Sequence, residues 1–296
     1  MKILIGHRGL NVIGGSETFT YTLVKALLEL GEEVDIFTLG TGPVFHRMQN
    51  DLGIKQVTSG VYDIVFASQS STIQNIINAN ITSPLVQVCH GTKNSLENPH
   101  SGADKHISIS KEVKLYVESK GYESELIYNP IDTDRFKPMR DLNPNIKRVL
   151  DLTHHAKTSE IIQTIAKRKG WEVLRLDKYG KWKWNVEDYI NRADLVFSLG
   201  RGTAESLACG RPVFVWDKRY GAEFPYGDGV LDKSNIHSSL EYNFSGRKFK
   251  KKFSEDNIIK EIEQKYDPNL QNFYIDFIRD NMDSKTIALE YANWRT

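Results

Sequence analysis

The sequence has few cysteines, no excess of charge of either sign and no long hydrophobic run. Only Cys89 and Cys209 occur among its 296 residues, which excludes a disulfide scaffold and a four-thiolate zinc site. The 39 basic and 38 acidic residues give a net charge of +1, so no electrostatic argument favours nucleic acid or an anionic membrane as the main partner. No apolar run approaches the roughly 18 residues of a membrane span, and the apolar N-terminus is too short for a signal peptide. We therefore expect a cytoplasmic protein.

The apolar residues fall into short runs that alternate with helical patterns, which is typical of parallel sheets covered by helices. At about 150 residues per domain, the length predicts two domains. A proline-rich break at residues 129–145 separates two such sets, which predicts two Rossmann-like α/β domains over 1–140 and 141–270. The tail, about 270–296, is expected to be helical in its first part and to pack back on the N-terminal domain. Strands are expected at 3–6, 33–38, 64–67, 85–89, 105–109, 148–153, 171–176, 195–199 and 212–216.

A glycine pair, Gly14 and Gly15, lies between the first expected strand and a helix expected at 17–30. Glycines let the backbone approach an anion, and the amides at a helix start favour negative charge. The alternative is a plain turn in which Ser16 or Glu17 caps the helix. The Gly-x-Gly-x-x-Gly fingerprint and a Walker lysine are absent, so a nicotinamide oxidoreductase is a poor interpretation.

A histidine and a glycine, His90 and Gly91, follow the strand expected at 85–89. Ligands of open α/β sheets bind outside the carboxyl ends of the strands. His90 can therefore meet a substrate hydroxyl or a developing charge, with Gly91 giving access. The alternative is a surface-loop histidine satisfied by local backbone.

The most informative segment is Gly200-Arg201-Gly202-Thr203, which joins a strand to a helix expected to enter at Thr203. The amides of Gly202 and Thr203, with the Arg201 guanidinium beside them, suit a phosphate group. Glu205 is expected in the first helical turn, where its carboxylate can accept hydrogen bonds from the two vicinal hydroxyls of a ribose. The alternative is a carboxylate that merely stabilises the helix dipole.

Together these segments resemble, in order, the retaining glycosyltransferases of GT-B fold in family 4. The resemblance covers residues 1 to about 220 and includes Ile109-Ser110-Lys111, the run from Asn129-Pro130 to Lys137-Pro138, and Glu205 to Val213. Asn243-Phe244-Ser245-Gly246-Arg247 is similar to short bacterial members. It implies two Rossmann-like domains facing across a cleft, an acceptor-side N-terminal domain and a donor-binding C-terminal domain. It also implies that Gly14 and Gly15 contact the donor diphosphate, His90 the transferred sugar, Glu205 the ribose and residues 200–203 a phosphate.

Two departures from the family pattern concern charged residues. Most members carry two acids eight residues apart, and here the first position is Phe197 while the second is Glu205. Members also carry an Arg and a Lys after the first strand of the second domain, where this chain has Thr153-His154-His155-Ala156-Lys157. Lys157 is predicted to keep the lysine role and Arg201 to replace the arginine. Adjacent histidines diverge and no third ligand accompanies them, so no metal is expected.

The resulting prediction is a metal-independent hexosyltransferase of glycan biosynthesis that uses a UDP-sugar or a GDP-sugar with retention. The acceptor is a glycan, a lipid-linked molecule or a small molecule, not nucleic acid. The alternatives are a nucleotide-sugar epimerase and a catalytically lapsed nucleotide-sugar binding subunit. Predicted catalytic residues are His90, Lys157 and Arg201, and predicted donor-binding residues are Gly14, Gly15, Gly91, Gly200, Gly202, Thr203 and Glu205.

Lysines alternate with aromatic residues in one segment, and a basic run follows later in the chain. They can line an anionic acceptor, lie on a membrane face as a peripheral contact, or form ordinary solvated surface. Their residues are Lys178, Tyr179, Lys181, Trp182, Lys183 and Trp184, and Arg247, Lys248, Lys250, Lys251 and Lys252.

Overall fold

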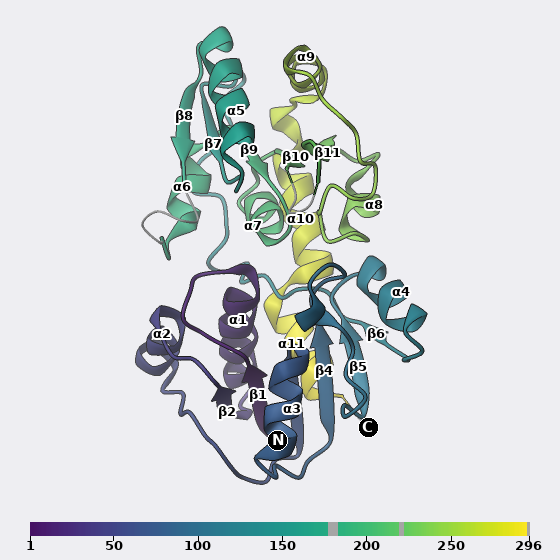
Figure 1. The fold of residues 1–296 in the computed structure, drawn as a ribbon. Helices are drawn as coiled ribbons and strands as arrows, with labels where there is room; N and C mark the ends of the chain where they lie inside the picture. The colour runs from purple at the N-terminus through teal and green to yellow at the C-terminus, as the bar shows by residue number, and fades with distance from the viewer. Residues whose placement is uncertain (177–182, 219–221, 295–296) are drawn as a thin grey trace. The chain divides into compact units, whose positions relative to one another are not determined.

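The computed structural model describes residues 1–176, 183–218 and 222–294, and the chain divides into two compact units (Figure 1). The N-terminal unit comprises Met1–Asp132 and Met282–Thr296, and the C-terminal unit comprises Thr133–Asn281. None of the helices among the described residues is long and apolar enough to cross a membrane. Each unit is described by itself below.

The N-terminal unit is built on a six-stranded parallel sheet with the order β2-β1-β3-β4-β5-β6. Helix α11 packs against α1, so the end of the chain belongs to this unit (Figure 1). The strands are β1 (Lys2–His7), β2 (Glu33–Thr38), β3 (Ile64–Ser68), β4 (Leu85–Cys89), β5 (Lys105–Ser108) and β6 (Glu125–Leu126). The helices are α1 (Gly15–Glu29), α2 (Pro43–Leu52), α3 (Ser70–Asn78), α4 (Lys111–Ser119) and α11 (Ser284–Ala292), with a short 3-10 turn η1 (Ser95–Glu97).

The C-terminal unit is built on a five-stranded sheet with the order β11-β10-β9-β7-β8, in which only β11 runs antiparallel. Its strands are β7 (Arg148–Asp151), β8 (Glu172–Arg175), β9 (Leu195–Ser198), β10 (Val213–Asp217) and β11 (Tyr226–Val230). Its helices are α5 (Ala156–Lys169), α6 (Val186–Arg192), α7 (Arg201–Ala208), α8 (Ile236–Leu240), α9 (Glu255–Lys265) and α10 (Gln271–Met282), with the 3-10 turn η2 (Pro268–Leu270).

The sheets are buried because apolar residues occupy both faces of the central strands. All residues of β3, β4, β9 and β10 are buried. Continuous apolar strands of this kind are typical of parallel sheets covered on both faces, as the alternating pattern predicts. The carboxyl ends of neighbouring parallel strands meet at one edge of each sheet, which fixes where the loops that carry the chemistry emerge.

The boundary between the units lies earlier in the chain than the expected position after residue 140. The Met139 amide donates to Asn191 Oδ1 at 2.8 Å, and Arg140 Nε donates to the Asn191 carbonyl at 2.9 Å. These bonds attach the proline-rich segment to α6, so residues 133–140 belong to the C-terminal unit. The expected tail is also split between the units. Tyr274 of α10 donates to the Leu231 carbonyl at 2.8 Å within the C-terminal unit, and only the residues from Met282 onwards belong to the N-terminal unit.

Asp194, which precedes β9, holds the start of the C-terminal unit in place. Its side chain is 0% exposed and accepts from Arg140, Asn143 and the amides of Lys147 and Arg148 at 2.7–3.0 Å. Burial alone would raise the pKa of this carboxyl, but the amides of Lys147 and Arg148 and the Arg140 guanidinium hold the pKa below its usual value. Asp194 is thus an ionised group whose charge is compensated inside the fold.

Asp194→Asn is expected to destabilise the protein by about 3 kcal/mol at neutral pH. The NH2 group of asparagine would point at the groups that donate to Asp194, so that neither side could accept a hydrogen bond. A lowered folded-state pKa means that the stabilisation is present above the ordinary carboxyl pKa of about 4 and is lost as pH falls through the folded value. Urea unfolding at pH 7 and in acid should therefore show the two proteins converging as the pH falls. Asp256→Asn, which removes an exposed partner of Arg168, is the control and should cost less than about 1 kcal/mol. An equal loss at every pH would contradict the assignment.

Candidate functional site

His90 lies directly after β4, at the carboxyl edge of the N-terminal sheet. Its Nε2 is 3.0 Å from Ser68 Oγ at the end of β3, and its ring packs edge-on against Phe19 of α1 with centroids 4.6 Å apart. The His90 amide donates to Glu97 Oε2 at 2.8 Å. Side chains from three elements therefore fix the ring and backbone of this histidine, in contrast to a surface-loop histidine satisfied only by local backbone.

Glu97 and Glu17 are carboxylates that the sequence analysis did not place in this site. Burial raises the pKa of Glu97, the His90 amide opposes that rise, and the Glu17 charge adds to it. Glu17 folds back over Gly14, where a side chain's first carbon would lie 2.5 Å from Glu17 Oε2. A side chain at Gly14 would therefore displace the Glu17 carboxylate from its position at the start of α1.

The other two predicted glycines of this unit leave space beside the same edge. A first side-chain carbon at Gly15 would meet no atom of the described residues within 4 Å, and one at Gly91 would meet only Glu97 Cγ, at 3.6 Å. Neither glycine is required by packing. The structure thus brings Gly14, His90 and Gly91 together around Glu17 and Glu97.

Gln69 is a further polar residue of this edge that the sequence analysis missed. It precedes α3 with φ 65°, a left-handed conformation that non-glycine residues rarely adopt, and its Oε1 accepts from the Arg8 amide at 3.2 Å. Its amide nitrogen lies 3.2 Å from Nε2 of His7, whose pKa burial lowers to about 4. Strained polar residues of this kind cluster at functional sites.

In the C-terminal unit, Gly200 forms the turn between β9 and α7. Its φ of 61° with ψ −132° is a region accessible to glycine, and its amide donates to the Phe244 carbonyl at 2.9 Å. Asn243 and Phe244 themselves have φ of 51° and 49°. The structure therefore joins two segments that were separate in sequence, the Gly200 turn and the Asn243–Arg247 motif.

Gly200→Ala is expected to destabilise the protein by about 1–3 kcal/mol, because alanine resists this φ. The carbon added at Gly200 would meet only the Asn243 carbonyl oxygen, at 3.9 Å, so the cost comes from the backbone and not from a clash. Thermal unfolding of the variant checks this. Gly15→Ala in the other unit is the control, because Gly15 has no positive φ, and an equal loss in both variants would contradict the interpretation.

Helix α7 begins at Arg201, not at Thr203, so Glu205 is its fifth residue and lies beyond the first turn. The expected helix start was wrong because Gly200 is the N-cap although it has no capping side chain, so the helix begins two residues before Thr203. Helix α1 likewise begins at Gly15 after Gly14, two residues before the expected start. The Thr203 amide is used within the turn, where it donates to the Gly200 carbonyl at 3.0 Å.

Arg201 and Glu205 form an ion pair along α7, with Nε to Oε1 at 2.8 Å. Both side chains are largely buried, and Glu205 as a whole is 8% exposed. Burial raises the pKa of Glu205 and Arg201 opposes the rise, as does Arg135. Arg135 binds Glu187 at 2.7 Å and stacks on Trp184, so a second Arg–Glu pair, absent from the sequence prediction, supports the first.

Lys157 is exposed in the first turn of α5, which follows β7. Its ammonium group forms no ion pair with the part of the chain that the structure describes, although a cation at a helix start is unfavourable without an anion. His155 caps this helix by accepting the Lys157 amide at 3.3 Å, and the His154 amide donates to Asp217 Oδ2 at 2.9 Å. Because β7 and β9 are parallel neighbours, Lys157 and Arg201 emerge at the same sheet edge.

Buried hydroxyls mark both helix starts at this edge. The Oγ1 atoms of Thr158, on α5, and Thr203, on α7, have no hydrogen-bond partner among residues 1–176, 183–218 and 222–294. Buried polar atoms are normally satisfied, so two orphaned hydroxyls beside two helix N-termini favour a polar ligand at this edge. Over the same residues, no group of three His, Cys, Asp or Glu side chains could hold a metal ion.

Phe197 lies inside β9 and not in the turn that follows it. It is the third residue of β9, is 0% exposed, and packs on Phe214 with ring centroids 5.4 Å apart. Counting eight residues back from Glu205 reaches the core because only two residues separate β9 from α7. Of the basic aromatic residues predicted at 178–184, Lys178, Tyr179, Lys181 and Trp182 lie outside the described residues.

Two Rossmann-like α/β units in one chain are the architecture of the GT-B fold, and solved structures share it over almost the whole chain. HepE from Anabaena, in complex with UDP-glucose, matches with a TM-score of 0.61 at 14% identity, over 99% of this chain and 98% of that one. A glycosyltransferase from Rickettsia africae matches with 0.63 at 13%, over 98% and 97%. A UDP-N-acetylglucosamine 2-epimerase matches with 0.56 at 10%, over 98% and 94%. No protein-family model and no curated protein sequence matches.

Proposed function

We propose that the protein transfers a sugar from a nucleotide diphosphate donor to an acceptor. The observation that carries the proposal is the C-terminal sheet edge, where Arg201 and the exposed Lys157 lie at two helix starts and Arg201 holds the buried Glu205 one turn further along α7. Helix starts favour an anion, and a carboxylate can accept hydrogen bonds from hydroxyls. A nucleotide sugar carries both an anionic diphosphate and neighbouring hydroxyls.

The leaving diphosphate needs compensation of its negative charge in the transition state. We assign this role to Lys157, to the Gly202 amide and the Thr203 hydroxyl in the first turn of α7, and to the turn at Gly200. Arg201 acts on the same phosphates through its terminal guanidinium nitrogens, while its Nε holds Glu205. The two orphaned threonine hydroxyls support a phosphate beside both helix starts.

The Glu205 carboxylate is proposed to accept hydrogen bonds from the vicinal hydroxyls of the ribose. Its carboxylate is kept in one orientation by Arg201, and Arg135 adds a second favourable charge. An oriented, charged acceptor binds two hydroxyls more strongly than a solvated one, because charge-assisted hydrogen bonds are the strong ones.

In the N-terminal unit, His90 is proposed to lie beside the transferred sugar, with Gly14 and Gly15 at the diphosphate and Gly91 giving access. The Ser68 contact and the Phe19 ring restrict the imidazole to one orientation, which a catalytic contact requires. We propose retention at the anomeric carbon by attack on the same face, without a metal. The donor is a UDP-sugar or a GDP-sugar, and the acceptor a glycan, a lipid-linked molecule or a small molecule.

Nucleotide-induced stabilisation tests the donor assignment. UDP or GDP at a hundred times its dissociation constant should stabilise the protein by about 2.7 kcal/mol, and the corresponding nucleotide sugar should be hydrolysed slowly or transferred. Adenosine diphosphate is the control nucleotide. Absence of stabilisation by UDP and GDP, together with no consumption of any nucleotide sugar, would reject the proposal.

A nucleotide-sugar epimerase is the second candidate, favoured by the similarity to the 2-epimerase fold. It would convert one nucleotide sugar into another and need no acceptor. Product analysis in the absence of acceptor separates the two functions: an isomeric nucleotide sugar favours the epimerase, whereas free sugar and nucleoside diphosphate favour the transferase. Binding of the nucleotide with neither product would favour the catalytically lapsed subunit.

A further inference from the structure

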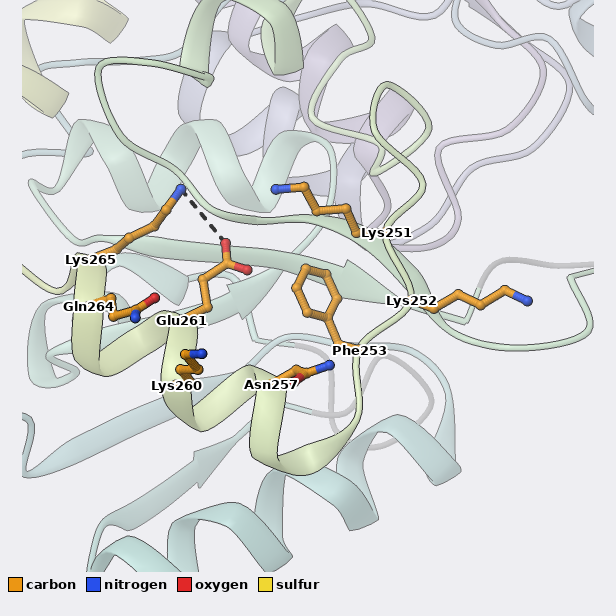
Figure 2. A pocket seen from close by; sticks show the side chains of 8 residues that line it. All are labelled: Lys251, Lys252, Phe253, Asn257, Lys260, Glu261, Gln264 and Lys265. Carbon is orange, nitrogen blue, oxygen red and sulfur yellow. Dashed lines mark ion pairs between the residues drawn. The ribbon is translucent and has the colours of Figure 1, made fainter.

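The C-terminal unit carries a strongly basic surface that begins at Arg247, the last residue of the motif joined to the Gly200 turn. Residues 247–253, Arg-Lys-Phe-Lys-Lys-Lys-Phe, contain five cations and no acid, in a chain whose net charge is only +1. The last three of these residues, together with α9, line a pocket of about 340 Å³, shown in Figure 2. Its lining includes Lys251, Lys252, Phe253, Asn257, Lys260 and Lys265.

Most of these cations are not compensated by acids. Lys265 pairs with Asp232 at 2.8 Å and Lys248 with Glu241 at 3.4 Å. Within the described parts of the chain, the ammonium groups of Lys250, Lys251, Lys252 and Lys260 pair with no carboxylate.

The acids of α9 do not relieve this concentration of charge, because they are used elsewhere. Asp256 accepts from Arg168 at 2.7 Å, and Glu263 accepts from Lys169 at 2.5 Å, both on α5. Glu261, the acid that lines the pocket, accepts from the Val230 amide at 3.0 Å and lies 3.8 Å from Lys265. The basic surface is therefore attractive to an external polyanion.

The backbone holds this surface in a fixed shape. The Lys251 amide donates to the Gly227 carbonyl at 2.8 Å, and the Gly227 amide donates back to the Lys251 carbonyl at 3.0 Å, which ties the segment to β11. Figure 2 shows Phe253 beside Lys251, with Lys252 extending away from α9. Because the backbone of this segment is already ordered, binding of a partner to the lysines would not require the entropy cost of ordering a loose loop.

Aromatic rings accompany the lysines. Phe249 is 39% exposed and lies under Lys251 Nζ at 5.4 Å, and Lys252 Nζ lies 3.6 Å from the centre of the Phe224 ring. Lysines with exposed aromatic groups between them suit the headgroup region of a bilayer, where the cations meet lipid phosphates and the rings enter the interface. We propose that residues 247–252 and Lys260 dock the C-terminal unit on a membrane containing anionic phospholipids.

Vesicle flotation with the full chain tests this docking surface. Vesicles of phosphatidylcholine with about 30% phosphatidylglycerol should bind the protein, and pure phosphatidylcholine should not, because anionic lipids attract polybasic segments. Each lysine near such a surface contributes about fivefold to the partition coefficient, so K250Q/K251Q/K252Q should lower it about 100-fold. The binding should also weaken as salt is raised.

The control variant K55Q/K105Q/K120Q removes the same charge from exposed lysines of the N-terminal unit and should bind nearly as the unaltered protein does. Both variants should unfold at the temperature of the unaltered protein, because the altered side chains are exposed. Three results would overturn the proposal: no binding to the anionic vesicles, an equal loss in both variants, or a larger effect of K250Q/K251Q/K252Q on a short DNA duplex than on vesicles. Phe249→Ala should reduce vesicle binding further without changing its salt dependence.

Discussion

Phe197→Glu is expected to prevent the C-terminal unit from folding, although it restores the acid that the family pattern carries eight residues before Glu205. Phe197 is 0% exposed in a cluster with Phe214, Trp216 and Val149. Removing a buried phenylalanine side chain costs about 3–5 kcal/mol, and the buried charge adds several more. The sum approaches the whole stability of an ordinary domain, which is about 5–15 kcal/mol.

Far-UV circular dichroism and soluble yield measure the result, and Phe197→Leu is the matched control. Leucine keeps an apolar side chain in the same place and should cost at most about 2 kcal/mol, so that variant should fold. If Phe197→Glu folded with an unchanged unfolding temperature and gained transfer activity, position 197 would belong to the site and not to the core.

Nine of the eleven strands in the described parts of the chain could be predicted from the sequence, because buried parallel strands leave apolar runs. The edge strand β6 was not predicted, because two residues are too few to leave a pattern. The antiparallel strand β11 was not predicted, since Tyr226-Gly-Asp-Gly-Val230 has almost no apolar pattern and its glycines suggest a loop. Gly227 is required there: a side chain's first carbon would lie 1.9 Å from the Val215 carbonyl oxygen. At Gly227 the absence of a side chain therefore does not indicate a turn. It allows β11 to pair closely with β10.

The candidate site was predictable where a motif and a strand end coincide, as at His90 and Gly200. The partners of those residues were not, because they come from other parts of the chain. Ser68 lies 22 residues before His90, and Phe244 lies 44 residues after Gly200. Glu97 returns to the His90 amide through the turn η1, which no periodicity marks. Phe197, which the sequence analysis named as the position without an acid, lies in the core and not in the site.

Glu205→Gln is expected to weaken nucleotide binding about 10- to 100-fold while leaving the fold intact. Glutamine keeps the size of the side chain and an oxygen that can accept from Arg201, but it loses the charge that strengthens hydrogen bonds to two ribose hydroxyls. A hydrogen bond to a charged group contributes about 1.5–3 kcal/mol, which corresponds to this range of affinity. Titration calorimetry with the preferred nucleoside diphosphate measures the change.

Glu205→Ala should have a second effect that separates binding from stability. It leaves the Arg201 guanidinium, which is only 9% exposed, without its carboxylate, and loss of one partner of a buried pair costs about 3–5 kcal/mol. The alanine variant should therefore lose both nucleotide affinity and unfolding temperature, whereas the glutamine variant should lose mainly affinity. Glu172→Gln, which breaks the exposed Arg148–Glu172 pair at the opposite end of the strands, is the control for removing an Arg–Glu pair.

The pH dependence supplies an independent check on the same carboxyl group. Burial raises the pKa of Glu205, so its charge is lost at a higher pH than that of an exposed glutamate. Nucleotide affinity of the unaltered protein should consequently fall on mild acidification towards that of Glu205→Gln, which should not respond in this way. If the two proteins keep a constant ratio of affinities across this range, the ionised Glu205 carboxylate does not bind the ribose, and its role is confined to holding Arg201.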